Sequence, residues 1–163
     1  MASETEDLLT TLQRLTADLM KTVNAAPKEA LDWKPGPDTN SVWAIATHAL
    51  GACRHWLVAV IAREGNPRDR DSEFLAAASE VADLQRTSER WLADAQRILT
   101  AMSSADLDAP ADLARTTGML WPRMGTISNR AAVLHVVEHL GLHIGHVELT
   151  LQLWQMQHAP AAG

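Results

Sequence analysis

The chain of 163 residues contains no tyrosine and only one phenylalanine, Phe74. Tyrosine and phenylalanine favour strands, so the scarcity of these two aromatics argues against a sheet, although six tryptophans are present. Alanine and leucine dominate the composition instead, and both are strong helix formers. The sequence therefore predicts helices rather than strands.

Cysteine is nearly absent, because Cys53 is the single one in the chain. A lone cysteine excludes an internal disulfide. Cys53 stands among apolar residues within a predicted helix, and we interpret it as a small buried core residue. A thiol nucleophile is the alternative.

Basic clusters are also missing. The formal net charge is −6 and the isoelectric point is near 5.6. Because affinity for nucleic acid comes largely from neutralised phosphates, this composition argues against a nucleic-acid-binding protein. Three arginines in one connection are interspersed with acidic residues, and we interpret that segment as a solvated linker. The segment contains Arg63, Glu64, Arg68, Asp69, Arg70 and Asp71.

No uninterrupted apolar run approaches the ~18 residues expected of a membrane span. The first seven residues, Met1–Asp7, are acidic and lack the basic start of a signal peptide. These absences predict a cytoplasmic protein without a membrane partner.

Apolar residues recur at helical spacing in four long segments, over residues 5–25, 41–64, 79–102 and 128–157. The length fits a single domain over 1–163. We therefore predict an all-α fold, a four-helix bundle with long connections. Because at least two connections are long, simple up-down-up-down order is not assured.

The connections carry their own signals. Pro35, Gly36 and Pro37 predict irregular structure over 26–40, and Gly65 followed by Asn66-Pro67 predicts the end of the second helix. The 25-residue connection before the last helix is unusually long, which is typical of functional loops. Its part from Leu113 to Ile127, with Trp121, is predicted to line a substrate entrance.

Four of the seven histidines lie in one stretch of the last helix. At roughly 100° per residue, His135, His139, His143 and His146 fall in one narrow stripe. An i, i+4 pair such as His139 and His143 is able to hold one metal ion. Solvent-facing histidines and satisfied core histidines are the alternatives.

The second helix carries His48 beside small residues, namely Ala44, Gly51 and Ala52. Small neighbours leave room for an ion, a water or a substrate. If the second and fourth helices are neighbours, His48 meets His139 and His143. Three imidazoles leave a coordination position open, as in catalytic sites, and nitrogen ligands suit Zn, Ni, Co, Fe or Mn.

Three segments resemble the DinB/YfiT-like family of metal-binding four-helix bundles. They are Leu31–Val42, which is similar to the family's Trp-x-Pro turn, Ala46–Leu50 with His55-Trp56-Leu57, and Glu138–His146, which resembles its His-x-x-x-His-x-Gly-Gln signature. The resemblance implies that His48, His139 and His143 form a metal triad. It also implies a homodimer.

The same resemblance implies an enzyme that uses a low-molecular-weight thiol, such as mycothiol or bacillithiol, as a transferase or isomerase, or else a hydrolase. A non-catalytic metal-binding or stress-response protein is the alternative. His146 stands where the family has glutamine. We predict His146 as a proton shuttle or as a residue that supports the ligands, with His135 as a weaker candidate.

Overall fold

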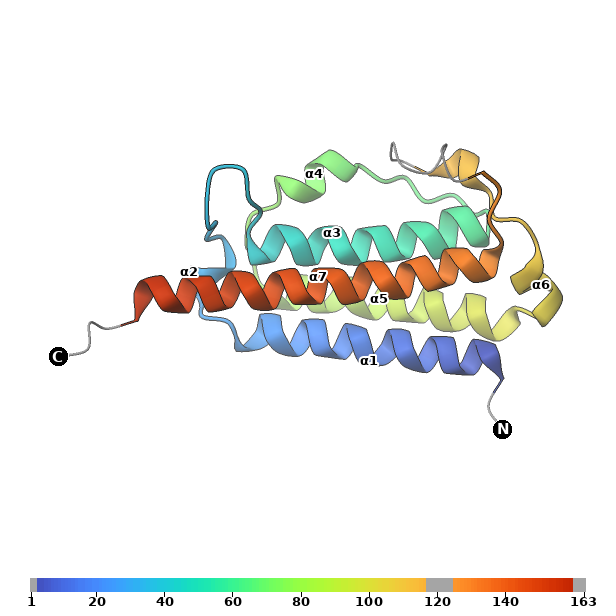
Figure 1. Cartoon of the computed structure of the whole chain (residues 1–163), viewed down its shortest axis with the longest axis horizontal. Helices are drawn as coiled ribbons and strands as arrows, with labels where there is room; N and C mark the ends of the chain where they lie inside the picture. Colours follow the sequence, from blue (N-terminus) through green and yellow to red (C-terminus); the bar gives the residue numbers. More distant parts are fainter. Residues whose placement is uncertain (1–2, 117–124, 160–163) are drawn as a thin grey trace.

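The computed structural model describes residues 3–116 and 125–159. Within these residues the chain is helical, and the only β-type pairing is an isolated bridge between Pro110 and Ser128. The predicted all-α fold is confirmed (Figure 1). Its four long helices are α1 (Glu4–Ala25), α3 (Val42–His55), α5 (Val81–Ala101) and α7 (Asn129–His158).

Shorter helical segments occupy the connections or extend a long helix. A π-helix, Trp56–Ile61, continues α3 directly, so the two form one rod. The remaining short elements are α2 (Lys28–Leu31), α4 (Arg70–Phe74), α6 (Ser104–Asp108) and a 3₁₀ turn (Leu113–Arg115).

The four long helices run in an up-down-down-up order. Helix α1 packs against α5 and α7, and α3 packs against the same two helices. In Figure 1, α1 and α7 run in one direction, whereas α3 and α5 run in the other. Because α3 and α5 are parallel, the connection over 62–80 must return along the bundle. It carries α4 across α3 on the way.

Serine side chains fix the starts of three long helices. Ser3 and Glu6 form a reciprocal capping box at α1. Ser41 accepts a hydrogen bond from the backbone nitrogen of Ala44, and Ser128 accepts one from Ala131. Each bond satisfies a backbone donor that has no partner within its helix.

Three details of the predicted connections were wrong. The second helix ends at Ile61 rather than at 64, and the reversal uses Arg63 in the left-handed region (φ 59°) instead of Gly65. The 26–40 connection contains α2, which begins directly after Pro27 and ends before Pro35, so the later prolines do not oppose it. The connection before α7 contains α6, which Ser103 caps together with Asp106.

Trp91 joins α5 to α1 in the centre of the bundle. It is fully buried, and its indole nitrogen donates to the Thr16 hydroxyl at 2.9 Å. The same hydroxyl donates to the Leu12 carbonyl at 2.8 Å. Cys53 is buried as well, which confirms its predicted core position, and burial raises the pKa of its thiol to about 12. A thiolate nucleophile is thereby disfavoured.

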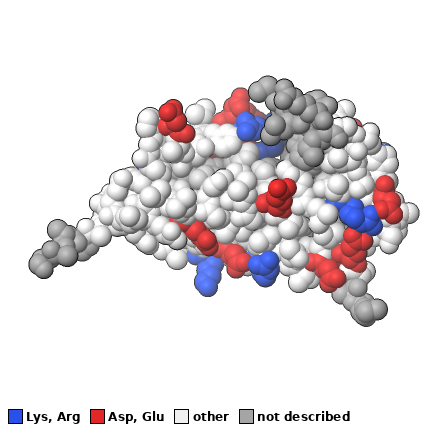
Figure 2. Space-filling model, viewed as in Figure 1, with Lys and Arg blue, Asp and Glu red and all other residues white. Residues whose placement is uncertain are grey.

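One helical stretch, Val42–Ile61, is long and apolar enough to cross a membrane by length and composition. Its most apolar window is 83% buried within the bundle, as expected of a core helix. Figure 2 shows broad areas without charged side chains on the face where α7 lies in front. Large apolar side chains exposed on α7 are Leu134, Leu142, Leu149 and Met156.

Candidate metal centre

The structure brings His48 of α3 together with His139 and His143 of α7. One ring nitrogen from each lies within 4.8 Å of the others. The ring centroids are 5.2 Å apart for His48 and His139, 5.0 Å for His48 and His143, and 4.4 Å for His139 and His143. Antiparallel packing of α3 against α7 thus produces the cluster that the sequence predicted.

Glu73 and Arg68 from the 62–80 connection reach His48, and the sequence did not predict either. Glu73 Oε2 lies 2.9 Å from His48 Nδ1. Arg68 binds both carboxylate oxygens, with Nε 2.7 Å from Oε1 and Nη2 2.6 Å from Oε2. All three side chains are nearly buried, at 7%, 10% and 8% exposure for His48, Glu73 and Arg68. The interpretation of Arg68 as part of a solvated linker was therefore wrong.

Gly51 makes room for this carboxylate. A Cβ atom added at Gly51 would overlap Glu73 Oε1. The small residue beside His48 therefore provides space as predicted, but a side chain of the same protein fills that space. Phe74 follows on α4 and stacks on the His48 ring at 4.3 Å between centroids. No local periodicity marks these residues, because they lie 25 and 26 positions beyond His48 in a polar connection.

Two further histidines, His146 and His135, lie beside the triad without joining it. His146 Nδ1 lies 3.3 Å from His143 Nδ1, and the His135 ring lies 5.7 Å from that of His139 and 4.8 Å from Trp56. His55 is buried elsewhere on the rod, with Nε2 2.8 Å from the Arg115 carbonyl.

Burial keeps the α7 ligands neutral. It lowers the pKa of His139 to about 3, and the neighbouring imidazoles of His143, His48 and His135 lower that pKa further. Burial also lowers the pKa of His143 to about 4, with smaller contributions from His48 and His146. A neutral imidazole has a lone pair available for a metal, so both groups are in their ligating form at neutral pH.

For Glu73, the interactions with its partners, rather than burial, decide the direction of the pKa shift. Burial raises its pKa, but the hydrogen bonds from His48 and Arg68 and the charge of Arg68 outweigh burial, so the pKa is lowered overall. The carboxylate is therefore charged at neutral pH. Its charge is offset by Arg68, with which it forms a buried ion pair.

Metal-free protein is expected to lose stability as the pH falls from about 6.5 toward about 4. Unfolded histidines take up protons near pH 6.5, whereas folded His139 and His143 resist protonation until pH values of about 3 and about 4. Stability is therefore complete above the unfolded pKa and decreases below it, by up to about 1.4 kcal/mol per pH unit for each histidine.

Urea unfolding at pH 7 and at pH 5 measures this loss. The charged and titratable groups that act on His139 and His143 are His48, His135, His146 and Arg68. His139→Gln removes one proton-binding group and should flatten the dependence, whereas replacement of the exposed His158 should not. Equal stability of the wild type at the two pH values would contradict the burial of these imidazoles.

The residues present fit a divalent transition metal. The Nδ1 atom of His139 is buried and has no hydrogen-bond partner among the described residues. Nitrogen ligands at about 2.0–2.1 Å from an ion lie roughly 3.4 Å from one another in tetrahedral geometry. The three donors lie within 4.8 Å of one another, so they must come closer together to reach that separation. The donor set consists of imidazoles alone, which suits transition metals rather than Ca²⁺ or Mg²⁺.

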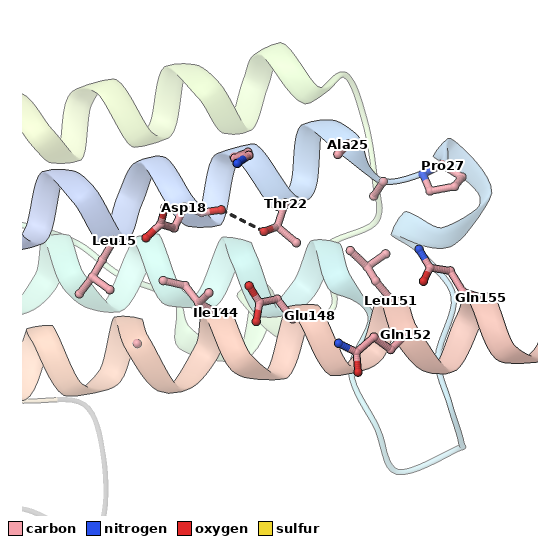
Figure 3. Close-up of a pocket in the computed structure, with 13 residues that line it drawn as sticks. Leu15, Asp18, Thr22, Ala25, Pro27, Ile144, Glu148, Leu151, Gln152 and Gln155 are labelled. Atoms are coloured by element: carbon pink, nitrogen blue, oxygen red, sulfur yellow. Dashed lines mark hydrogen bonds between the residues drawn. The ribbon is translucent and has the colours of Figure 1, made fainter.

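A separate open groove of about 680 Å³ lies between α1 and α7 (Figure 3). Asp18 and Thr22 line it from α1, and Ile144, Glu148 and Gln152 line it from α7. This is the side of α7 that faces α1, whereas the triad is on the side that faces α3. The predicted entrance residue Trp121 lies outside the described residues.

The sequence and the structure of this chain are similar to those of known proteins. A family model described as the DinB superfamily matches residues 11–147. No curated protein matches. A conserved protein from Enterococcus faecalis aligns with TM-score 0.73 and 12% identity, over 94% of this chain and 98% of that chain.

A DinB-like protein from Bacillus subtilis, YjoA, aligns with TM-score 0.65 and 18% identity, over 94% of each chain. At these identities the structural matches show the fold alone. The family match covers most of the sequence, including all three clustered histidines. The chain belongs to the DinB superfamily.

Proposed function

We propose that this protein is a metal-dependent enzyme whose ion is held by His48, His139 and His143. The observation that carries the proposal is the meeting of three imidazole donors within 4.8 Å at a half-buried position. The metal is a divalent transition ion, Zn, Ni, Co, Fe or Mn. A bound ion of this kind lowers the pKa of a thiol or a water and stabilises the resulting thiolate or hydroxide as a nucleophile.

Charge favours an anion as the further ligand. Three neutral imidazoles add no charge, and Glu73 is offset by Arg68. A divalent ion at this place would therefore keep its full charge in a partly buried site. A thiolate or a hydroxide reduces that charge, which supports a low-molecular-weight thiol such as mycothiol or bacillithiol as cosubstrate, or water in a hydrolase.

His146 is the residue that we assign to proton transfer. It is exposed, and its Nδ1 lies 3.3 Å from His143 Nδ1, so it stands between the ligands and solvent. An imidazole is able to accept a proton from a thiol on one ring nitrogen and to pass a proton on to water.

The proposal is tested by measuring both the metal content and the enzymatic activity of the protein. Elemental analysis of protein reconstituted with metal is expected to find one divalent ion per chain. The same protein is expected to consume a thiol and an electrophile in a transferase or isomerase assay, or to hydrolyse an ester or amide. Metal binding without turnover in any of these assays would favour the non-catalytic metal-binding or stress-response protein. Absence of stoichiometric binding would overturn the metal site itself.

A further inference from the structure

Glu73 contacts a triad histidine from outside the ligand set, and its role rests on the proposed metal site. Of the three clustered histidines, His48 is the one with a carboxylate partner among the described residues. We infer that Glu73, held by Arg68 in the space left by Gly51, is a positioning residue that fixes the tautomer and the orientation of His48 for metal binding.

The tautomer follows from the contacts at Nδ1. A carboxylate only accepts hydrogen bonds, so the 2.9 Å contact requires His48 Nδ1 to carry the proton. Arg68 Nη2 is 3.4 Å from the same nitrogen, but an arginine only donates, and it has a shorter bond to Glu73 at 2.6 Å. The proton on Nδ1 leaves the Nε2 lone pair of His48 free for an ion.

Arg68 determines where the carboxylate lies. Two parallel hydrogen bonds, one to each Glu73 oxygen, fix both the plane and the position of the carboxylate. Because Oε2 also lies 2.9 Å from His48 Nδ1, the carboxylate is directed at the ring of His48 and supports it from outside the ligand set. Histidine ligands of metals commonly donate their second nitrogen to such a carboxylate, which sets the ring orientation.

Gly51 permits the arrangement because it has no Cβ atom. Because a methyl group at this position would overlap Glu73 Oε1, the carboxylate would have to move away from its place beside Nδ1. Gly51→Ala therefore displaces Glu73 while leaving both charges of the ion pair in the protein. This matters because Glu73→Ala leaves Arg68 buried without a partner and is liable to unfold the chain.

Long-range ¹⁵N–¹H NMR of the metal-free protein at pH 8 reads the tautomer directly. The wild type is expected to have His48 protonated on Nδ1. Gly51→Ala, and Glu73→Ala where it folds, should shift His48 toward the Nε2-protonated form. Gly141→Ala is the matched control, because a Cβ there meets no atom within 4 Å. Asp71→Ala is the second control, since that carboxylate on α4 is 94% exposed.

Cobalt titration supplies a second measurement. The affinity for Co²⁺ is expected to fall about 10–100-fold in Gly51→Ala, and the visible absorption of the complex to change in shape, because an outer partner of a ligand is lost. Glu73→Gln, which retains an acceptor oxygen, should lie between wild type and Gly51→Ala.

The outcomes separate the two proposals. An unchanged His48 tautomer in Gly51→Ala and Glu73→Ala would overturn the positioning role, whether or not the protein binds metal. If wild-type His48 is protonated on Nδ1 but the protein binds no Co²⁺, the proposed metal function would be overturned. The hydrogen bond from His48 to Glu73 would still be supported by that result.

Discussion

Metal affinity is expected to fall by at least about 100-fold, or about 2.7 kcal/mol, when His139 is replaced by alanine. His139 is more deeply buried than His143, the other α7 donor. The centroid of its ring lies 4.4 Å from that of His143 and 5.2 Å from that of His48. Removal leaves two donors on different helices, which cannot surround an ion. Competition titration with a chromophoric chelator measures the affinity.

The control for this change is His158→Ala at the exposed end of α7. That variant should bind metal as the wild type does. Circular dichroism of metal-free His139→Ala should retain the helical signal, because the core residues of α7 are other than His139. Equal affinity in wild type and His139→Ala would place the ion elsewhere and remove the basis of the triad.

Trp91→Ala is expected to lower the free energy of unfolding by about 3–5 kcal/mol, the largest effect of a single core change here. The side chain is fully buried between α5 and α1, so its loss leaves a cavity as well as removing apolar contact. The hydrogen bond to Thr16 is lost too, which adds roughly 1 kcal/mol. Urea unfolding monitored by circular dichroism measures the change.

Two further variants divide this effect into parts. Thr16→Val removes only the hydroxyl partner and should cost about 1 kcal/mol. Trp154→Ala removes a tryptophan that is only partly buried near the end of α7, and it should cost much less than Trp91→Ala. A loss below about 1.5 kcal/mol in Trp91→Ala would mean that α1 and α5 do not pack as described.

The fold and the His139–His143 pair were predictable because both follow from local periodicity, whereas the addition of His48 depended on the packing of two helices and on the family resemblance. Apolar spacing gave the four long helices to within a few residues, and the i, i+4 relation of His139 and His143 places both on one side of α7. The π-helix of Trp56–Ile61 had no such signal, because its residues are as apolar as those of an ordinary buried helix. The predicted helix over 41–64 therefore contains no irregular segment, and its end falls after Ile61, where the observed rod ends.

Glu73 and Arg68 were not predictable for a different reason. They lie in a connection whose charges alternate, and such a pattern is usually solvated. Only the path of the chain brings them to His48, and that path follows from the parallel order of α3 and α5. Gly51 was the one available signal, since a glycine one turn from a histidine in a helix interior needs a reason.

The homodimer inferred from the resemblance stays a prediction.

The returning connection has a consequence for local unfolding. Segments held by few buried apolar contacts open at lower free energy than the core around them. The short α4 is attached to α3 through Phe74 and the Arg68–Glu73 pair, whereas α3 itself is buried along its length. We therefore expect α4 to detach more readily than the bundle unfolds, and its detachment would uncover His48 and remove Glu73 from its ring nitrogen. If His48 binds a metal as proposed, exchange of that metal is expected to follow the rate of this local opening rather than the rate of global unfolding.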